Sequence, residues 1–205
     1  MSLGANGSTV FIVDDDAGIR HSFEMLFRAT GQSVESFATA EAFLEAYDPT
    51  RLGCLVIDVH MPGMSGLDLQ DLFLAKNVRI PMIIMTGQGD VAMAVAAVKK
   101  GAIDFLIKPF EEQVLLQRVE QALKADVQRR QEQARQAAFQ ARLDRLTPRE
   151  RQVLDLLLAG KGNKEIALDL GLSRKTVDIH RAHIMMKFGV ESLLEIAQMK
   201  STNPL

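Results

Sequence analysis

The sequence predicts an α/β domain built on a doubly wound, five-stranded parallel sheet, followed by a smaller all-α domain of four helices. Two observations lead to this prediction. Residues 9–124 alternate short apolar runs with segments of helical periodicity, and several of the runs are apolar throughout, as strands covered on both faces are. After Leu146 only helical periodicity remains, interrupted by Gly, Asn and Ser at the expected helix ends.

Each predicted strand of the first domain begins near one short apolar run, at Thr9, Ser33, Cys54, Pro81 and Asp104. Four helical segments separate these runs: Ala17–Thr30, Thr39–Tyr47, Gly66–Lys76 and Asp90–Lys100. A fifth helical segment follows the last run, from Glu111 onward. This alternation is typical of a parallel sheet covered by helices on both faces. Ligands of such sheets bind beyond the carboxyl ends of the strands, so the residues that follow the strands are candidates for a site.

Changes in composition mark the boundaries of the first domain. Residues 1–8 are small and polar and are expected to form a disordered N-terminus or a cloning remnant, so the domain spans residues 9–124. Residues 125–146 are predicted to be a helical linker that continues the fifth helix. Between Ala125 and Ala141 this linker is rich in Gln, Arg, Glu and Ala, contains no Gly or Pro and lacks a clear apolar stripe, which is typical of an exposed helix.

The second domain, residues 147–205, opens with a helix-start signature. Thr147 and Glu150 are spaced as a capping box, and Pro148 takes the first position of a helix that ends at Gly160. Three further helices are predicted: Lys164–Leu170 with Asn163 as its cap, Arg174–Phe188 with Ser173 as its cap, and about Ser192–Met199. The short joint at Gly171 between the second and third helices is typical of a helix-turn-helix.

Composition and charge narrow the class of protein. The single cysteine, Cys54, cannot form an internal disulfide, and no apolar run approaches the ~18 residues of a membrane span, which favours a cytoplasmic protein without a membrane partner. Residues 1–124 contain 10 Lys and Arg against 16 Asp and Glu, an acidic balance that suits a cation site. Residues 125–205 contain 14 against 10, a mildly basic balance that permits contact with nucleic acid.

Charged or hydroxyl side chains follow four of the predicted strands. Asp14 and Asp15 follow the first strand, Asp58 the third, Thr86 the fourth and Lys108 the fifth. Carboxylate oxygens are the ligands that Mg²⁺ prefers, and a carboxylate can itself act as a nucleophile and form an aspartyl phosphate. The metal and Lys108 would then supply positive charge to the oxygens of the phosphoryl group, and Thr86 would offer them a hydroxyl donor. One such residue alone is most simply a solvated strand end, but the combination indicates a site that handles phosphate.

Residues 9–124 resemble the receiver domain of bacterial two-component response regulators, which has a flavodoxin-like fold. The resemblance rests on Asp14-Asp15, Asp58 followed by Met61-Pro62-Gly63 and Gly66, Thr86-Gly87, and Lys108-Pro109-Phe110. It implies that Asp58 is the phosphoacceptor and that Lys108 pairs with the phosphoryl group. It also implies a switch formed by Thr86 and Phe105, and Mg²⁺ bound to Asp14, Asp15, Asp58 and the backbone carbonyl of His60.

The helix Arg174–Phe188 is predicted to present one face to DNA. Its apolar positions fall on a single face, interrupted only by His180, so the opposite face is free to enter a major groove. Periodicity alone leaves open an ordinary amphipathic surface helix. The predicted contacts to phosphates and bases are Lys164, Arg174, Lys175, Asp178, Ile179, Arg181, Ala182 and Lys187.

The second domain resembles the LuxR-type helix-turn-helix over nearly its full length. Matching positions are Thr147-Pro148-Arg149-Glu150, Gly160, Asn163-Lys164, Ile166-Ala167, Leu172-Ser173, Thr176-Val177, His180, Ile184 and Lys187. Asp178 and Ala182 stand where some relatives carry lysine, so the DNA sequence they bind does not transfer to this chain. The domain order and Gly87-Gln88-Gly89-Asp90 are most similar to the FixJ-like group of regulators.

These resemblances predict a transcriptional regulator, not an enzyme, whose Asp58 is phosphorylated by a sensor histidine kinase. Phosphorylation would promote a homodimer through the 90–100 helix and the 104–107 strand, and binding to double-stranded promoter DNA. Two alternatives stay open. One is a Mg²⁺-dependent phosphoesterase that works through an aspartyl phosphate. The other is a phosphorylation-independent DNA-binding protein with a vestigial receiver.

Overall fold

The computed structural model describes residues 7–88 and 91–201 of the chain, and its contacts divide the chain into two compact units, Met1–Arg129 and Arg130–Leu205. Of the N-terminal segment 1–8 that was predicted to be disordered, residues 1–6 lie outside the described residues. Ser8, the last residue of that segment, is buried, and its carbonyl accepts a hydrogen bond from the side chain of Gln32. The two units are taken in turn.

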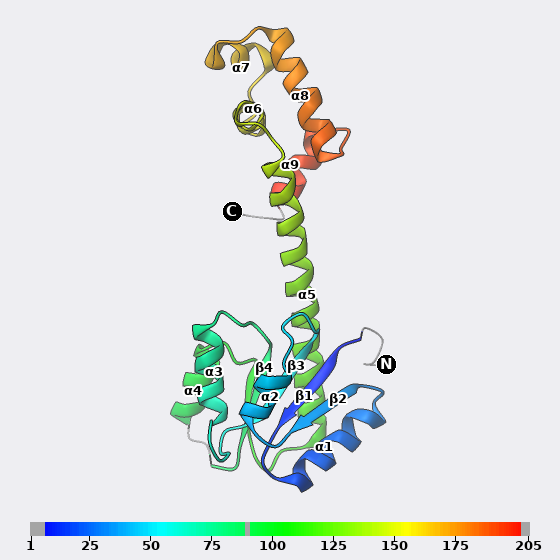
Figure 1. Ribbon diagram of the computed structural model, residues 1–205, viewed down its shortest axis with the longest axis vertical. Coiled ribbons are helices and arrows are strands. Elements are labelled where there is room, and N and C mark those ends of the chain that lie inside the picture. Colours follow the sequence, from blue (N-terminus) through cyan, green and yellow to red (C-terminus); the bar gives the residue numbers. More distant parts are fainter. Residues whose placement is uncertain (1–6, 89–90, 202–205) are drawn as a thin grey trace. The chain divides into compact units, whose positions relative to one another are not determined.

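The first unit is built on the predicted five-stranded parallel sheet (Figure 1). Its strands are β1 (Thr9–Val13), β2 (Ser33–Phe37), β3 (Gly53–Asp58), β4 (Met82–Thr86) and β5 (Asp104–Ile107). The strand order is β2-β1-β3-β4-β5 and every pairing is parallel, which is a doubly wound arrangement that reverses between β1 and β3.

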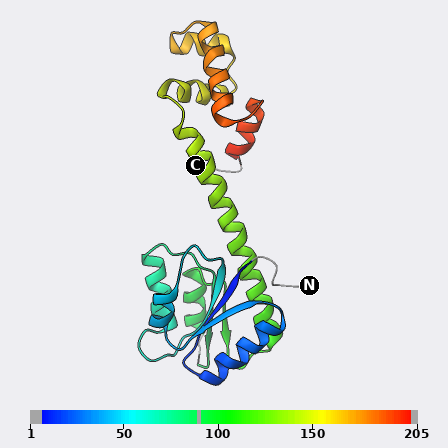
Figure 2. The same cartoon turned by 45° about the vertical axis from the view of Figure 1, so that its right-hand side comes forward.

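Five helices cover the two faces of the sheet. They are α1 (Ala17–Ala29), α2 (Ala40–Ala46), α3 (Gly66–Ala75), α4 (Val91–Lys99) and α5 (Glu112–Asp144). Figure 2 shows α2, α3 and α4 on one side of the sheet and α1 and α5 on the other. Each side has its own core because successive strand residues point to opposite faces: Phe11 of β1 packs with α2 and α3, whereas Ile12 packs with α1 and α5.

The second unit contains the four predicted helices, α6 (Pro148–Leu158), α7 (Asn163–Leu170), α8 (Arg174–Phe188) and α9 (Leu193–Ser201). Thr147 and Glu150 form the expected capping box, and the hydroxyl of Ser173 caps α8. The prediction for α7 was wrong at its first residue. Gly162 is the N-cap, since its amide donates to the Glu165 carboxylate at 2.8 Å, and Asn163 is already helical.

Helix α5 runs without a break through the segment that was expected to be an exposed linker. The segment is not exposed throughout: Asp126 is fully buried in the first unit, and Phe139 and Leu143 are buried in the core of the second. These two residues lie four positions apart, so they form an apolar stripe of only one turn, too short to stand out in the sequence. No helix within the described residues is both long and apolar enough to cross a membrane.

Candidate functional site

The predicted phosphate-handling residues meet at the carboxyl edge of the first sheet, around Lys108. Asp14 directly follows β1 and Asp58 ends β3, so both carboxylates lie at the same edge. The Nζ atom of Lys108 lies 2.7 Å from Oδ2 of Asp14 and 2.6 Å from Oδ1 of Asp58. The two aspartate side chains are only 2% and 8% exposed, so water screens these ion pairs less than it would on the surface.

The backbone amide of His60 and the side chain of Arg20 hold the acidic residues of this edge in place. The amide of His60 donates to Oδ2 of Asp58 at 2.7 Å, which leaves both oxygens of this carboxylate engaged. Arg20, near the start of α1, donates to the carbonyl oxygens of Asp14 and Asp15 at 2.7 and 2.9 Å. The loop that carries both acidic residues is therefore tied to α1.

The charge at this edge is negative on balance. Burial raises the pKa of Asp14 above its ordinary value, against the lowering effect of the hydrogen bond from Lys108. Burial by itself would lower the pKa of Lys108, but the hydrogen bonds and the attraction of Asp14 and Asp58 raise it, so the ammonium stays charged. Asp15 is exposed and forms no ion pair with any other described residue. Lys108 and Arg20 thus bring two positive charges to an edge with the three carboxylates of Asp14, Asp15 and Asp58.

The donor atoms at this edge fit a hard divalent cation. Within residues 7–88 and 91–201 no three His, Cys, Asp or Glu side chains come together as a ready metal cluster. Mg²⁺ does not require such a cluster, because it keeps several waters and is usually bound by one or two carboxylates together with phosphate oxygens. Asp15, Asp58 and nearby backbone carbonyls supply that chemistry.

The two predicted switch residues lie on the adjacent strands β4 and β5, of which β4 pairs with the strand that ends at Asp58. Thr86 is fully buried at the end of β4; its hydroxyl lies 3.2 Å from Nδ1 of His60 and accepts a hydrogen bond from the amide of Gln88. Phe105 of β5 is half-buried and packs against the core on the α4 side of the sheet. These residues thus connect the acidic edge with the surface of α4 and β5.

In the second unit, α8 divides into a buried and an exposed face as predicted. Val177, Ile184 and Phe188 are buried in the core, and His180 is half-buried. The opposite face is exposed and carries the predicted DNA contacts Lys175, Ile179 and Ala182, together with Met186. Arg174 at the start of α8 and Lys164 on α7 are exposed as well.

Asn163 holds two of the predicted DNA contacts in a fixed arrangement. Its Nδ2 donates to the carboxylate of Asp178, and its Oδ1 accepts a hydrogen bond from Arg181 at 2.7 Å. Asp178 and Arg181 lie three positions apart on α8, on neighbouring turns. A single amide at the start of α7 therefore orients an acidic and a basic side chain together.

Lys187 differs from the other predicted contacts because its ammonium is engaged inside the domain. It lies 2.6 Å from Oε2 of Glu150, which is buried in α6, and is itself only 24% exposed. Nδ1 of His183 lies 3.6 Å from the other oxygen of Glu150. Lys187 thus joins α8 to α6, which is a structural contact and not a free positive charge.

Sequence reasoning missed the roles of Arg20, Asn163 and Glu150 as partners of other polar side chains. Arg20 stands six residues after Asp14, where a long side chain on the first turns of a helix reaches back over the preceding loop. Asn163 and Glu150 were assigned only to caps. Their partners lie on a different helix, and nothing in the sequence indicates which polar side chains meet across a helix packing.

Comparisons with known proteins agree with this arrangement. Residues 10–120 match the family model described as the response regulator receiver domain, and residues 144–200 match the model described as bacterial regulatory proteins of the luxR family. Among curated proteins, the chain is 44% identical to the transcriptional regulatory protein FixJ of Azorhizobium caulinodans over 93% of this chain and 90% of that one. It is 42% identical to nodulation protein W of Bradyrhizobium diazoefficiens over 94% and 85%.

Solved structures give the same result. A low-resolution structure of the response regulator StyR is 45% identical, with a TM-score of 0.87 over 95% of this chain and 98% of that one. Full-length FixJ from B. japonicum is 39% identical, with a TM-score of 0.60 over 97% of both chains. The chain therefore belongs to the two-component response regulators of the FixJ type, with a receiver domain and a LuxR-type helix-turn-helix DNA-binding domain, and phosphorylation-dependent regulation is the mechanism of this family.

Proposed function

We propose that Asp58 accepts a phosphoryl group from a phosphohistidine of a sensor kinase, and that this modification controls binding of the second unit to promoter DNA. A carboxylate oxygen of Asp58 attacks the phosphorus, the phosphorus–nitrogen bond breaks, and the imidazole leaves and takes up a proton. The observation that carries the proposal is the Lys108 ammonium 2.6 Å from Asp58. This charge is already in position to neutralise phosphoryl oxygens.

Mg²⁺ is the cofactor that we assign to this edge. Asp14, Asp15, Asp58 and the backbone carbonyl of His60 are its proposed ligands, and the unpaired exposed carboxylate of Asp15 among the described residues makes that residue the most direct one. The metal would add positive charge beside the phosphoryl oxygens. Mg²⁺ should raise the melting temperature of the full chain, and Asp15→Asn should remove most of that shift.

A shallow groove beside Lys108 fits the proposed docking of the kinase. It is lined by residues of α1 and of the loop before α5, among them Ile19, Phe23, Phe110 and Lys108. The rings of Phe23 and Phe110 stack at 6.2 Å, which provides an apolar surface next to the acidic edge. A kinase domain bound here would bring its histidine close to Asp58.

The surface of α4 and β5 is the proposed homodimer interface. Its exposed apolar side chains are Val91 (78% exposed), Val95 (46%), Val98 (48%) and Ile107 (50%). Met93, on the same helix, packs in part against the core. A second copy that covers these side chains would remove them from water, and this gain would stabilise the dimer.

DNA is the proposed target of α7 and α8. We assign phosphate contacts to Lys164, Arg174 and Lys175, and base contacts to Asp178, Ile179, Arg181 and Ala182, because these side chains share the exposed face of the helix-turn-helix or border it. Lys187 remains a proposed contact to the DNA backbone, made by an ammonium that is also paired with Glu150. The proposed output is regulation of transcription and not turnover of a substrate.

One experiment tests the function as a whole. The full chain is incubated with Mg²⁺ and acetyl phosphate, or with beryllofluoride, and its intact mass, oligomeric state and DNA affinity are measured. Phosphorylation is expected to add one phosphoryl group, produce a dimer and strengthen DNA binding. Asp58→Asn should abolish all three effects, whereas Asp155→Asn, at an exposed position of α6, should leave them unchanged.

The same experiment distinguishes the two alternatives. DNA binding that is equally tight with and without phosphodonor, and insensitive to Asp58→Asn, would indicate a vestigial receiver. Repeated turnover of small phosphoesters with release of phosphate would indicate the phosphoesterase. Either result would contradict the proposed switch.

A further inference from the structure

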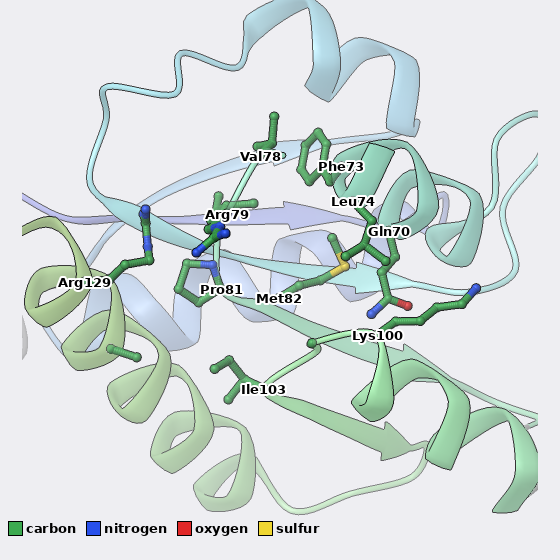
Figure 3. A pocket seen from close by; sticks show the side chains of 13 residues that line it. Gln70, Phe73, Leu74, Val78, Arg79, Pro81, Met82, Lys100, Ile103 and Arg129 are labelled. Atoms are coloured by element: carbon green, nitrogen blue, oxygen red, sulfur yellow. The ribbon is translucent and has the colours of Figure 1, made fainter. Parts of the chain in front are cut away.

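A groove with a volume of about 400 Å³ lies at the edge of the receiver sheet opposite to Asp58 (Figure 3). Pro81 and Met82, at the start of β4, line it together with residues from the ends of α3 and α4 and from α5. The acidic site adjoins Thr86 at the other end of β4, about 13 Å away at ~3.3 Å per strand residue. The groove is therefore separate from the phosphate-handling edge.

The walls of the groove are mainly apolar and partly exposed. Leu74 at the end of α3 is 52% exposed and Ile103 before β5 is 37% exposed, although both line a concave surface. Phe73, Val78 and Ile80 complete the apolar lining. A ligand with an apolar body would cover this surface, and the volume lies in the range of small-molecule sites.

The charged residues that line the groove are all cations: Arg79, Lys100 and Arg129. Lys100 pairs with Asp71, and Arg129 pairs with Asp126, which lie outside the lining. Arg79 forms no ion pair with any described residue; its Nε donates to Oδ1 of Asn77 at 3.2 Å. Figure 3 shows Arg79 and Arg129 at one end of the groove and Gln70 and Lys100 at the other.

Gln70 adds a polar group with unmet hydrogen-bonding capacity. Its side chain is 4% exposed and its Nε2 donates to the carbonyl oxygen of Ala97 at 2.8 Å. Its Oε1 is buried and meets no donor within the part of the chain that the structure describes. Buried acceptors in native proteins are nearly always satisfied by protein or ordered water, so we expect a water molecule to donate to this oxygen, at the end of the groove away from Arg79 (Figure 3).

We propose that this groove binds a small organic acid, a monocarboxylate with an aromatic or branched aliphatic body. The carboxylate pairs with Arg79, whose planar guanidinium suits bidentate contact with a carboxylate, and the body covers Leu74 and Ile103. Such a ligand contacts α3, the end of α4, the start of β4 and α5 at once. Its binding therefore stabilises the receiver unit, because it adds contacts that exist only in the folded state.

The test uses 3-phenylpropanoate as the probe and the full chain labelled with ¹⁵N. Titration should shift the amide signals of Val78, Gly101 and Ile103 in a saturable way, while the signals around Asp58 stay in place. The neutral analogue 3-phenylpropanamide should bind at least about tenfold more weakly, since it cannot form the ion pair. Equal affinity for acid and amide, or shifts centred on the acidic edge, would overturn the proposal.

Two variants separate a specific site from general attraction to positive charge. Arg79→Gln should weaken binding of 3-phenylpropanoate at least about tenfold. Lys76→Gln removes the same charge from an exposed position close by that does not line the groove, and it should leave binding unchanged. If both variants weaken binding equally, or if neither does, the groove is not the assigned site. This inference does not depend on the phosphorylation of Asp58.

Discussion

Gly66 begins α3 in direct contact with the backbone of Asp58, and this contact explains why a side chain is excluded there. A Cβ atom at this position would lie 2.4 Å from the carbonyl oxygen of Asp58, which is backbone and cannot move aside alone. Gly66→Ala should therefore destabilise the receiver unit by about 1–3 kcal/mol. Urea unfolding, followed by the fluorescence of Tyr47, the single tyrosine of the chain, measures this change.

Gly87 provides the matched control for that substitution. A Cβ atom there would meet nothing within 4 Å, so Gly87→Ala should change the free energy of unfolding by less than about 0.5 kcal/mol. An equal loss of stability in both variants would mean that the contact with Asp58 does not determine the effect.

The polar residues of α7 and α8 predict two different kinds of DNA-binding defect. Lys164→Ala removes an exposed charge proposed to contact phosphate, so it should weaken binding to all DNA sequences and reduce the salt dependence. Asp178→Ala removes a proposed base contact and should change sequence preference. Asn163→Ala should act like Asp178→Ala, because Asn163 orients both Asp178 and Arg181.

Binding assays against a randomised DNA library at two salt concentrations distinguish these effects. A uniform loss of affinity for Asn163→Ala, with unchanged sequence preference, would contradict its positioning role. The three variants lie close together in the fold, so a control for correct folding is the unchanged protection of α6 in amide hydrogen exchange.

At the scale of single elements, Glu150 makes the stability of the second unit dependent on pH. Burial opposes ionisation of its carboxyl, but the hydrogen bonds from Lys187 and from Thr147 lower its pKa below the ordinary value of 4.5. The folded state thus favours the carboxylate. Its contribution to stability is fully present above pH 4.5 and is lost as the pH falls through the lowered pKa.

Glu150→Gln should accordingly cost about 1–3 kcal/mol at pH 7, where it replaces a charged partner of Lys187 by a neutral one. The difference between the variant and the native protein should shrink as the pH falls below 4.5. Amide hydrogen exchange of α6 and α8, measured from pH 7 downward, reports this unit separately from the receiver. A difference that stays constant over this range would show that shape and not charge matters at this position.

The elements themselves were largely predictable because each has a local cause. Strands such as β1 and β3 are runs of consecutive apolar residues, and α6 and α8 begin at Thr147 and Ser173 with caps that the sequence displays. The strand-end rule likewise brought Asp14, Asp58 and Lys108 to one edge. What the sequence does not contain is the choice of partner across a packed interface.

The ion pair between Lys187 and Glu150 illustrates this limit. Helical periodicity places Lys187 near the edge of α8, where it is equally compatible with contacting a phosphate or a neighbouring helix. The packing of α8 on α6 brings Lys187 to Glu150, and it depends on long-range contacts such as those of Val177 and Val153 in the core. The burial of Phe139 and Leu143 at the end of α5 was missed for the same reason.

At the scale of the whole molecule, the proposed switch requires that dimerisation and phosphorylation be separable. Val95 is 46% exposed on α4 and does not touch the acidic edge, so Val95→Asp should leave phosphorylation of Asp58 by acetyl phosphate intact. It should prevent the phosphorylated chain from forming a dimer, because a carboxylate would have to be buried in the apolar interface. Sedimentation velocity with and without phosphodonor measures the oligomeric state.

DNA binding then shows whether the dimer is the step that matters. Two linked DNA-binding domains on a double site gain about 10²–10⁴-fold in affinity over one, so phosphorylated Val95→Asp should lose a factor of this order on a two-half-site DNA. On a single half-site it should bind like the native protein.

Met25→Asp, at a 56% exposed apolar position of α1 on the other side of the sheet, is the matched control and should retain dimerisation and tight binding. If phosphorylated Val95→Asp stays monomeric yet binds the two-half-site DNA as tightly as the native protein, phosphorylation must act within one chain, and the α4–β5 surface does not transmit the signal.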